Sequence, residues 1–201
     1  MRIAVFGGSF NPVHIGHIEI VTRVLEKLYI DRILIIPTYI PPHKRQDMEI
    51  SPRHRLSMCG IAFGNLKSAV ISDIEIKRGG ESYTYLTLQE LKKRFPDDDL
   101  FLIMGADMFL SVQDWKNADI IFSLAAICGV PRNRGNLEVL KKHSAYLETL
   151  GAKASACDIE VPSVSSTQIR EMCMRGEDIG ELVPPMVEAY INFWGLYKSK
   201  Q

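Results

Sequence analysis

The sequence has no net charge and no long apolar run, and each absence excludes a class of protein. Its 24 Lys and Arg residues balance its 24 Asp and Glu residues. Proteins that bind nucleic acid or an anionic membrane surface through their electrostatic field need an excess of basic residues. No stretch approaches the roughly 18 apolar residues of a membrane-spanning helix. We therefore expect neither a nucleic-acid partner nor a membrane partner.

Cysteine is also scarce, and its spacing predicts neither a disulfide framework nor a zinc site. The four residues, Cys59, Cys128, Cys157 and Cys173, are scattered and include no C-x-x-C pair, so we expect buried free thiols in a reducing compartment. The opening apolar segment reaches Gly7 too early for a signal peptide. A hydrophobic content of 46% in 201 residues excludes a mainly disordered chain and is typical of one domain. These features predict a cytoplasmic globular protein.

The spacing of apolar residues alternates between strand and helix along the chain. Short apolar runs predict strands over 3–6, 32–37, 70–76, 100–104 and 125–130, and an extended segment over 154–161. Helical spacing predicts helices beginning near Ile18, Ser51, Thr84, Asn136, Ser166 and Pro184. This alternation is typical of an α/β protein with a parallel, doubly wound sheet. Ligands of such a sheet bind beyond the carboxyl ends of its strands, where the strand order reverses.

Several helix details follow from the same spacing. Thr84 is the expected N-cap of its helix, and Gly176 and Gly195 are expected to end the last two helices. The residues expected to face the core on the Ser51 helix and on the last helix are Leu56, Cys59, Phe63, Val187, Tyr190, Ile191 and Trp194.

The loop after the first predicted strand, residues 7–17, carries the strongest functional signal. Gly7 and Gly8 allow a ligand to approach the backbone, and the helix that follows directs free N–H groups at it, which favours phosphate. His14 and His17 lie on one face of the first helical turn, and Gly16 keeps that face open. The loop is neither a G-x-G-x-x-G dinucleotide motif nor a Walker A motif.

Two later segments could also bind phosphate. Pro41 and Pro42 stiffen a loop that presents Lys44, a candidate clamp for a triphosphate, although a solvated basic loop is the alternative. Ser166 and Thr167 begin a helix with Arg170 one turn later, which predicts a second anion site. An ordinary N-cap would explain the hydroxyls but not the arginine on the same face.

Two further residues are candidates for binding the other parts of a nucleotide. Asp107 follows a strand and Gly105, where a carboxylate can accept hydrogen bonds from ribose hydroxyls, or can cap a helix instead. Trp115 offers a flat surface for a pyridine ring, with packing in the core as its alternative.

Taken in order, these motifs resemble a known family. The string 7–17 resembles the signature of the nucleotidyltransferase superfamily, and residues 14–17 also spell the HIGH motif of class I aminoacyl-tRNA synthetases, whose greater length and tRNA-binding surface this chain lacks. The string occurs together with PPHK at 41–44, SYT at 82–84, GAD at 105–107 followed by Trp115, SSTQIR at 165–170 and the ending 182–197. The whole set, from Gly7 to Tyr197, resembles the bacterial nicotinate-nucleotide adenylyltransferases.

The chain departs from this family pattern at two places. Ser9 and Asn11 stand where family members often have Thr and Asp, and both keep their hydrogen-bonding capacity. After the fifth strand the family usually has two basic residues directly before Pro-Gly, whereas here Arg132 follows Pro131.

The resemblance implies a single Rossmann-like nucleotidyltransferase domain over 1–201, with a small C-terminal helical part over about 163–197. It implies transfer of the adenylyl group of ATP to nicotinate mononucleotide in NAD biosynthesis, with release of pyrophosphate. It also implies Mg²⁺ held mainly by ATP phosphates, with no protein residue assigned as a metal ligand. The same transfer to nicotinamide mononucleotide, a pantetheine phosphate or a polyol phosphate is an alternative, as is a catalytically silent nucleotide-binding protein. The sequence leaves the oligomeric state open, a homo-oligomer included.

The resemblance also assigns roles to individual residues. The catalytic residues are His14, His17, Lys44 and Arg170. The ATP-binding residues are Gly7, Gly8, Ser9, Phe10, Gly105, Asp107, Ser166, Thr167 and Arg170. The mononucleotide-binding residues are Ser9, Asn11, Lys44, Thr84, Trp115, Lys116 and Arg132.

Overall fold

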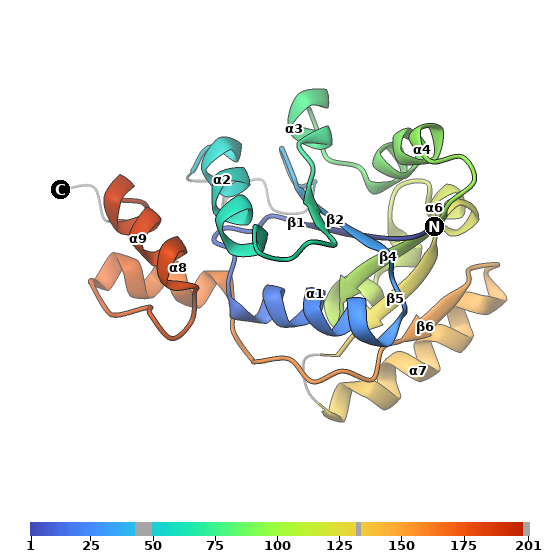
Figure 1. The fold of residues 1–201 in the computed structure, drawn as a ribbon. Helices are drawn as coiled ribbons and strands as arrows, with labels where there is room; N and C mark the ends of the chain where they lie inside the picture. Colours follow the sequence, from blue (N-terminus) through green and yellow to red (C-terminus); the bar gives the residue numbers. More distant parts are fainter. Residues whose placement is uncertain (43–49, 132–133, 199–201) are drawn as a thin grey trace.

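The computed structural model describes residues 1–42, 50–131 and 134–198, and these form a parallel β-sheet with helices on both faces (Figure 1). Every pairing between the sheet's neighbouring strands is parallel. The strands are β1 (Arg2–Gly8), β2 (Arg32–Pro37), β3 (Ala69–Ile71), β4 (Asp99–Gly105), β5 (Ala126–Val130) and β6 (Ala154–Ala156). The predicted α/β class and parallel sheet are confirmed.

The order of the strands in the sheet is β3-β2-β1-β4-β5-β6, so the chain winds outward in both directions from β1. The strand order therefore reverses between β1 and β4, which is the place where doubly wound sheets bind their ligands. Phe6 of β1 is in register with Ile103 of β4. Two residues further along each strand, Gly8 and Gly105 consequently end β1 and β4 side by side.

Alternate residues of the strands enter two separate cores, one on each face of the sheet. Ala4 and Phe6 of β1 belong to the first core, and Ile3 and Val5 to the second. The first core is covered by α1 (Ile15–Lys27), α2 (Pro52–Phe63), α8 (Ser166–Arg175) and α9 (Pro185–Trp194). The second is covered by α3 (Ile74–Arg78), α4 (Thr84–Arg94), α5 (Ala106–Phe109), α6 (Ala118–Leu124) and α7 (Arg134–Thr149), with the 3₁₀ turn η1 (Val112–Asp114) between α5 and α6.

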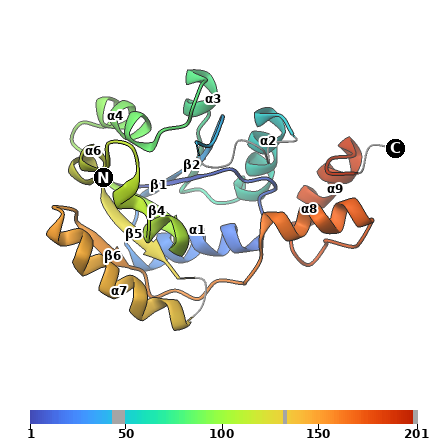
Figure 2. The ribbon, with the colours of Figure 1, turned by 180° about the vertical axis from the view of Figure 1, so that it is seen from behind.

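The C-terminal helices α8 and α9 lie at the end of the molecule where β1 ends and α1 begins (Figures 1 and 2). The backbone N–H of Ile15 donates to the carbonyl of Leu182 at 3.0 Å, which fastens the loop between α8 and α9 to the start of α1. Both helices end at the glycines predicted from the sequence, because Gly176 and Gly195 have φ angles of 71° and 59° that suit glycine best.

The predicted strand over 70–76 is wrong in its second half. The strand β3 ends at Ile71, and Ile74–Arg78 forms the short helix α3. Ile74 is buried in the second core, so its apolar character reflects packing of a helix and not continuation of the strand. A short apolar run does not by itself distinguish these two cases.

Helix boundaries and some core positions also differ from expectation. The N-cap of α4 is Tyr83, and Thr84 is the first helical residue. The helix α1 begins at Ile15, about one turn before Ile18. Trp194 is 54% exposed because it lies in the last turn of α9, beyond the buried Val187 and Ile191.

The cysteines can be compared with the buried free thiols expected from the sequence. Cys59, Cys128 and Cys157 are buried and Cys173 is half-buried, and all four are free thiols. No helix in 1–42, 50–131 or 134–198 combines the length and apolar character needed to cross a membrane.

Candidate functional site

The loop between β1 and α1, residues 7–14, is called the glycine loop here. Its conformation is tight: Phe10 has a φ of 46°, and its ring is buried against Phe6 and His17. A Cβ on Gly8 would lie 3.2 Å from the Phe10 ring, so this position favours glycine. Because the Phe10 side chain faces the core, the predicted contact of Phe10 with ATP would have to come from its backbone.

The two histidines form a stacked pair at the start of α1. His14 is the N-cap, its backbone N–H donates to Nδ1 of His17 at 3.2 Å, and the two ring centroids are 3.7 Å apart. Because His17 Nδ1 accepts this bond, a neutral His17 carries its proton on Nε2 and can donate it to a ligand. A Cβ on Gly16 would lie 3.1 Å from His14 Nδ1 and 3.3 Å from the carbonyl oxygen of Pro162, which explains glycine between the histidines.

Burial keeps both imidazoles neutral near pH 7. It lowers the pKa of His14 from 6.5 to about 4. It also lowers the pKa of His17 well below 6.5, and the neighbouring His14 acts in the same direction. The pair can therefore donate hydrogen bonds to phosphoryl oxygens, but it supplies no positive charge there at neutral pH.

The start of α8 packs directly against the glycine loop. Ser166 Oγ donates to the carbonyl of Pro12 at 2.8 Å. Arg170 donates from Nη1 to the carbonyl of Asn11 at 3.0 Å and from Nη2 to Oγ1 of Thr167 at 3.3 Å. The two anion-binding segments expected from the sequence therefore adjoin, and Arg170 lies between them. The N-cap of α8 is Ser165, whose Oγ accepts from Gln168 N, so an anion would meet the backbone of Ser166 and Thr167.

Asn11 and Ser9 take part in holding the loop itself. Asn11 is buried, and its Oδ1 accepts a hydrogen bond of 2.7 Å from the hydroxyl of Tyr197. The carbonyl of Ser9 accepts a hydrogen bond from Arg55. These contacts orient the loop, and the predicted contacts of both residues with a mononucleotide stay predictions.

Gly105 and Asp107 lie at the end of β4, beside the point where the strand order reverses. Gly105 is the N-cap of α5, and Asp107 is an exposed residue of that helix. This position suits the predicted contact of Asp107 with ribose hydroxyls, which the structure does not test.

The residues predicted to bind the pyridine ring come from two segments that the fold brings together. The ammonium group of Lys116 lies 4.3 Å from the ring centroid of Tyr83, which directly precedes Thr84. Trp115, next to Lys116, is half-buried against the second core. No side chain caps the N-terminus of α4, so N–H groups of its first turn can meet an anion. Tyr83, Thr84, Trp115 and Lys116 are called the pyridine cluster below.

Two of the predicted site residues, Lys44 and Arg132, lie outside the described residues. Their roles stay predictions. In the part of the chain that is described, no group of three or more His, Cys, Asp or Glu side chains is placed to hold a metal ion.

Sequence reasoning missed Arg55, which is fully buried in α2 and reaches the glycine loop. Its guanidinium donates from Nη1 to Ser9 O at 2.7 Å, and from Nη2 to Thr38 O at 2.6 Å and Tyr39 O at 3.2 Å. Burial lowers the pKa of Arg55 to about 10, which leaves it charged at pH 7. The spacing of Arg55, Cys59 and Phe63 by four residues was the available signal, because it places all three on one helical face.

Comparisons with known proteins identify the family of this chain. A family model described as cytidylyltransferase-like matches residues 5–172. A relative from Clostridium tetani, named "Probable nicotinate-nucleotide adenylyltransferase", is 35% identical, over 97% of this chain and 98% of that protein. A relative of the same name from Borreliella burgdorferi is 36% identical, over 100% of this chain and 98% of that protein.

Solved structures show the same fold. Plasmodium falciparum nicotinic acid mononucleotide adenylyltransferase complexed with NaAD matches with a TM-score of 0.76 at 20% identity, over 98% of this chain and 97% of that chain. The same protein complexed with APC also gives a TM-score of 0.76, at 18% identity over 98% of this chain and 96% of that one. On the family model and the full-length sequence relatives together, the chain belongs to the cytidylyltransferase-like family and, within it, to the nicotinate-nucleotide adenylyltransferases.

Proposed function

We propose that this chain is an enzyme that transfers the adenylyl group of ATP to nicotinate mononucleotide, forming nicotinate adenine dinucleotide and pyrophosphate. The observation that carries the proposal is the junction of two anion-binding segments. Arg170 and Ser166 bind carbonyls of the glycine loop, beside the place where the strand order reverses. A reaction between two phosphorylated substrates needs such a pair of adjoining sites.

The chemistry requires positioning more than proton transfer. The second pKa of a phosphate monoester is about 6, so the mononucleotide phosphate is ionised at pH 7. One of its oxygens forms the new bond to the α-phosphorus of ATP, and the bond from that phosphorus to the bridging oxygen breaks, so pyrophosphate leaves with the electron pair. The site has to align the two polyanions and stabilise charge on the α-phosphoryl group and the leaving group.

The described residues can supply this stabilisation. His17 has an Nε2–H donor once its Nδ1 accepts from His14 N. Arg170 brings a fixed positive charge between the glycine loop and α8. Neutral imidazoles and a guanidinium together act on phosphoryl oxygens without any general base.

Mg²⁺ fits this site as a partner of ATP. Mg²⁺ usually keeps several waters and binds substrate phosphates through few protein groups. The described residues offer exposed Asp107 near the carboxyl ends of the strands but no cluster of carboxylates, and this donor set suits an ion that arrives with the triphosphate. When bound, it would neutralise charge on the phosphates.

The pyridine cluster supports nicotinate mononucleotide as the acceptor. Trp115 can stack on the pyridine ring, while Lys116 and the uncapped start of α4 favour its carboxylate. A pantetheine phosphate or a polyol phosphate would need the glycine loop but not this cluster.

The test is pyrophosphate release from Mg·ATP with a panel of acceptors: nicotinate mononucleotide, nicotinamide mononucleotide, a pantetheine phosphate and a polyol phosphate. We expect the largest kcat/KM with nicotinate mononucleotide. Faster release with a pantetheine or polyol phosphate would overturn the assigned acceptor. Binding of ATP without release in any mixture would instead support a catalytically silent nucleotide-binding protein.

A further inference from the structure

Arg55 is a buried cation whose guanidinium, among the described residues, donates hydrogen bonds to three backbone carbonyls. It is 0% exposed, and no carboxylate in the described ranges forms an ion pair with it. Taking a guanidinium out of water is costly unless its hydrogen bonds are replaced. Three carbonyls replace these bonds at Nη1 and Nη2, while Nε has no partner among the described residues. The carbonyls belong to two segments: Ser9 in the glycine loop, and Thr38 and Tyr39 directly after β2.

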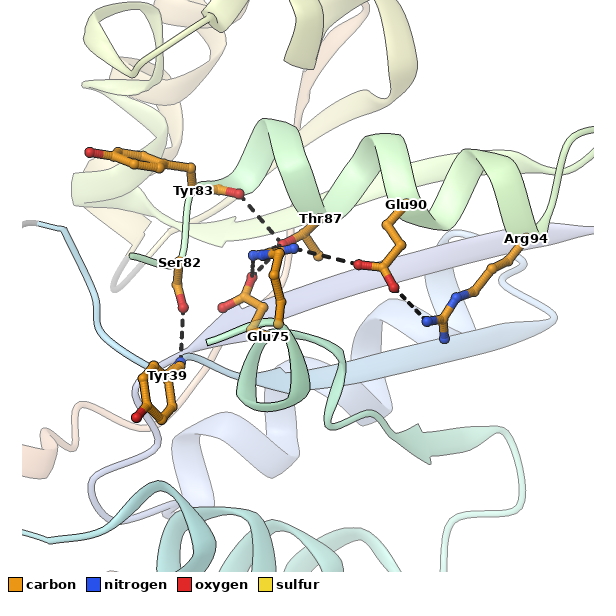
Figure 3. A network of polar contacts seen from close by, with 8 residues as sticks. Tyr39, Glu75, Ser82, Tyr83, Thr87, Glu90 and Arg94 are labelled. Atoms are coloured by element: carbon orange, nitrogen blue, oxygen red, sulfur yellow. Dashed lines mark hydrogen bonds and ion pairs between the residues drawn. The ribbon is translucent and has the colours of Figure 1, made fainter. Parts of the chain in front are cut away.

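The second of these segments continues to the pyridine cluster. The N–H of Tyr39 donates to Oγ of Ser82 at 2.8 Å, as Figure 3 shows. In return, the N–H of Ser82 donates to the carbonyl of Ile40 at 2.8 Å. Ser82 is buried and directly precedes Tyr83 and the first turn of α4. Hydrogen bonds therefore connect Ser9 to Arg55, Arg55 to Tyr39 and Tyr39 to Ser82, and Ser82 is joined to the pyridine cluster through its peptide bond with Tyr83.

A buried carboxylate on α3 lies behind Ser82. Glu75 is 5% exposed, and its Oε1 accepts a hydrogen bond of 2.6 Å from Oγ1 of Thr87 on α4 (Figure 3). Burial raises the pKa of Glu75, whereas the hydroxyls of Thr87 and Ser82 and the guanidinium groups of Arg78 and Arg55 act in the opposite direction. These contacts hold α3 against the start of α4. The Ser82 hydroxyl, at one end of the hydrogen bonds that begin at Ser9, therefore also interacts with a buried residue of α3.

We propose that Arg55 is a positioning residue that fixes the spacing between the glycine loop and the pyridine cluster, acting through Tyr39 and Ser82. The inference rests on the proposed function, which assigns phosphate groups to the glycine loop and α8 and the pyridine ring of the mononucleotide to the pyridine cluster. In-line transfer needs the attacking oxygen and the α-phosphorus within about 3–3.5 Å of each other. The planar fork of arginine can bind carbonyls of both segments at once, which the single ammonium group of lysine does less well.

The proposal predicts a loss of rate and not of affinity. In the Arg55→Lys variant each substrate can still bind to its own site, but the distance between the glycine loop and the pyridine cluster is less firmly fixed. We expect kcat to fall roughly 10- to 100-fold, since small misplacements cost that much, with each KM within about 3-fold of the wild type. The control is Leu147→Ala: Leu147 is buried near the C-terminal end of α7, at the opposite edge of the sheet. It should lower Tm while kcat, assayed well below Tm, stays unchanged.

A second variant keeps the test decisive even where Arg55→Lys does not fold. Ser82→Ala removes the hydroxyl that accepts from Tyr39 and also interacts with Glu75, and we expect kcat to fall by about 3- to 10-fold. Where both single variants fold, the double variant should lose less than the product of the two losses, because both act on one segment. Wild-type kcat in Ser82→Ala, or in a folded Arg55→Lys, would overturn the positioning role and leave the proposed function intact. A wild-type chain that transfers no adenylyl group would overturn both.

Discussion

At the scale of single residues, the two histidines show how burial selects a chemical role. An exposed imidazole near phosphate would become cationic below pH 6.5. Here burial lowers the pKa of His14 to about 4 and that of His17 well below its usual range. In the proposed site the pair would therefore serve as neutral hydrogen-bond donors, and positive charge would come from groups such as Arg170, which lies against the glycine loop.

His17→Ala should lower kcat by roughly 10²–10³, the usual cost of losing a donor to a transition-state oxyanion. Tm should also fall, because His17 accepts from His14 N and its ring contacts Phe10. His54→Ala is a matched control: His54 is a partly buried histidine whose Nδ1 pairs with the Tyr190 hydroxyl at 2.9 Å, between α2 and α9. Steady-state kinetics below both Tm values separate the effects, and equal kcat losses in the two variants would show that His17 is merely structural.

The histidine pKa values also predict how stability depends on pH. The folded-state pKa of His14, about 4, lies below its unfolded value of 6.5, so the unfolded chain binds a proton that the folded chain does not. This stabilisation is complete above pH 6.5 and is lost as the pH falls toward 4, by roughly 2 kcal/mol between pH 7 and 5. Urea unfolding at both pH values measures it. His14→Asn, which keeps an N-cap side chain, should reduce this loss; an unchanged loss would rule out His14 as its source.

At the scale of elements, the proposed phosphate site depends on the packing of the start of α8 against the glycine loop. Arg170→Lys keeps the charge but loses the fork that binds Asn11 O and Thr167 Oγ1. We expect the KM for ATP to rise about 10-fold or more, the cost of one charge-assisted hydrogen bond. Arg175→Lys on the same helix is the control, because Arg175 is exposed and pairs with Glu177, which lies two residues away and outside the glycine loop. Indistinguishable KM values for ATP in the two variants would remove Arg170 from the site.

Elements with a strong local signal could be predicted from the sequence, and those fixed by packing could not. The buried strands β1, β2, β4 and β5 are continuous apolar runs. The glycine loop is recognisable from its residue types, because glycines followed by histidines at the start of a helix are typical of a phosphate-binding loop. The helix α3 was predicted as strand because an apolar run of a few residues has no readable period. The segment from α5 to α6 consists of short helices that depend on contacts with the second core.

The same limit applies to the site. Residues proposed to contact a ligand through their side chains, such as His17 and Arg170, belong to motifs and could be named from the sequence. The role of Arg55 could not be predicted, because it depends on the carbonyl groups of Ser9, Thr38 and Tyr39. Every residue has a backbone carbonyl, so the residue types do not show which of them a guanidinium will contact. Leu56 is expected from the sequence on the buried face of α2 with Cys59 and Phe63. The four-residue spacing to Cys59 and Phe63 favours Arg55 for that position, and Arg55 is the residue that is fully buried.

At the scale of the whole molecule, the fold places the two proposed binding sites along the carboxyl edge of one sheet. The glycine loop and α8 lie on the side of the first core, and the pyridine cluster comes from elements on the side of the second core. The residues after β2 lie between them: Thr38 N donates to the carbonyl of Gly8 at 2.9 Å, and Tyr39 N donates to Ser82, which directly precedes the pyridine cluster. Transfer between two bound substrates is a property of this arrangement and not of any single motif.

The arrangement predicts a preference for the acid over the amide mononucleotide. These ligands differ only by a carboxylate against a carboxamide. The pyridine cluster offers donors from two sides, namely the uncapped first turn of α4 and the ammonium group of Lys116, which lies over the Tyr83 ring. A carboxylate only accepts hydrogen bonds, whereas the NH₂ of an amide would face donors and stay unpaired, at a cost of about 1–3 kcal/mol per contact.

One or two such contacts should favour nicotinate over nicotinamide mononucleotide by roughly 10²-fold or more in kcat/KM. The measurement is kcat/KM for both acceptors at a fixed concentration of Mg·ATP. Lys116→Gln should reduce this ratio of kcat/KM values, because it removes the positive charge from one side of the pyridine cluster. Lys93→Gln is the control: Lys93 is exposed near the C-terminal end of α4, and its substitution should leave the ratio unchanged. A ratio near one in the wild type would mean that water bridges both groups equally well, and the donor-lined pocket would be wrong even with adenylyl transfer intact.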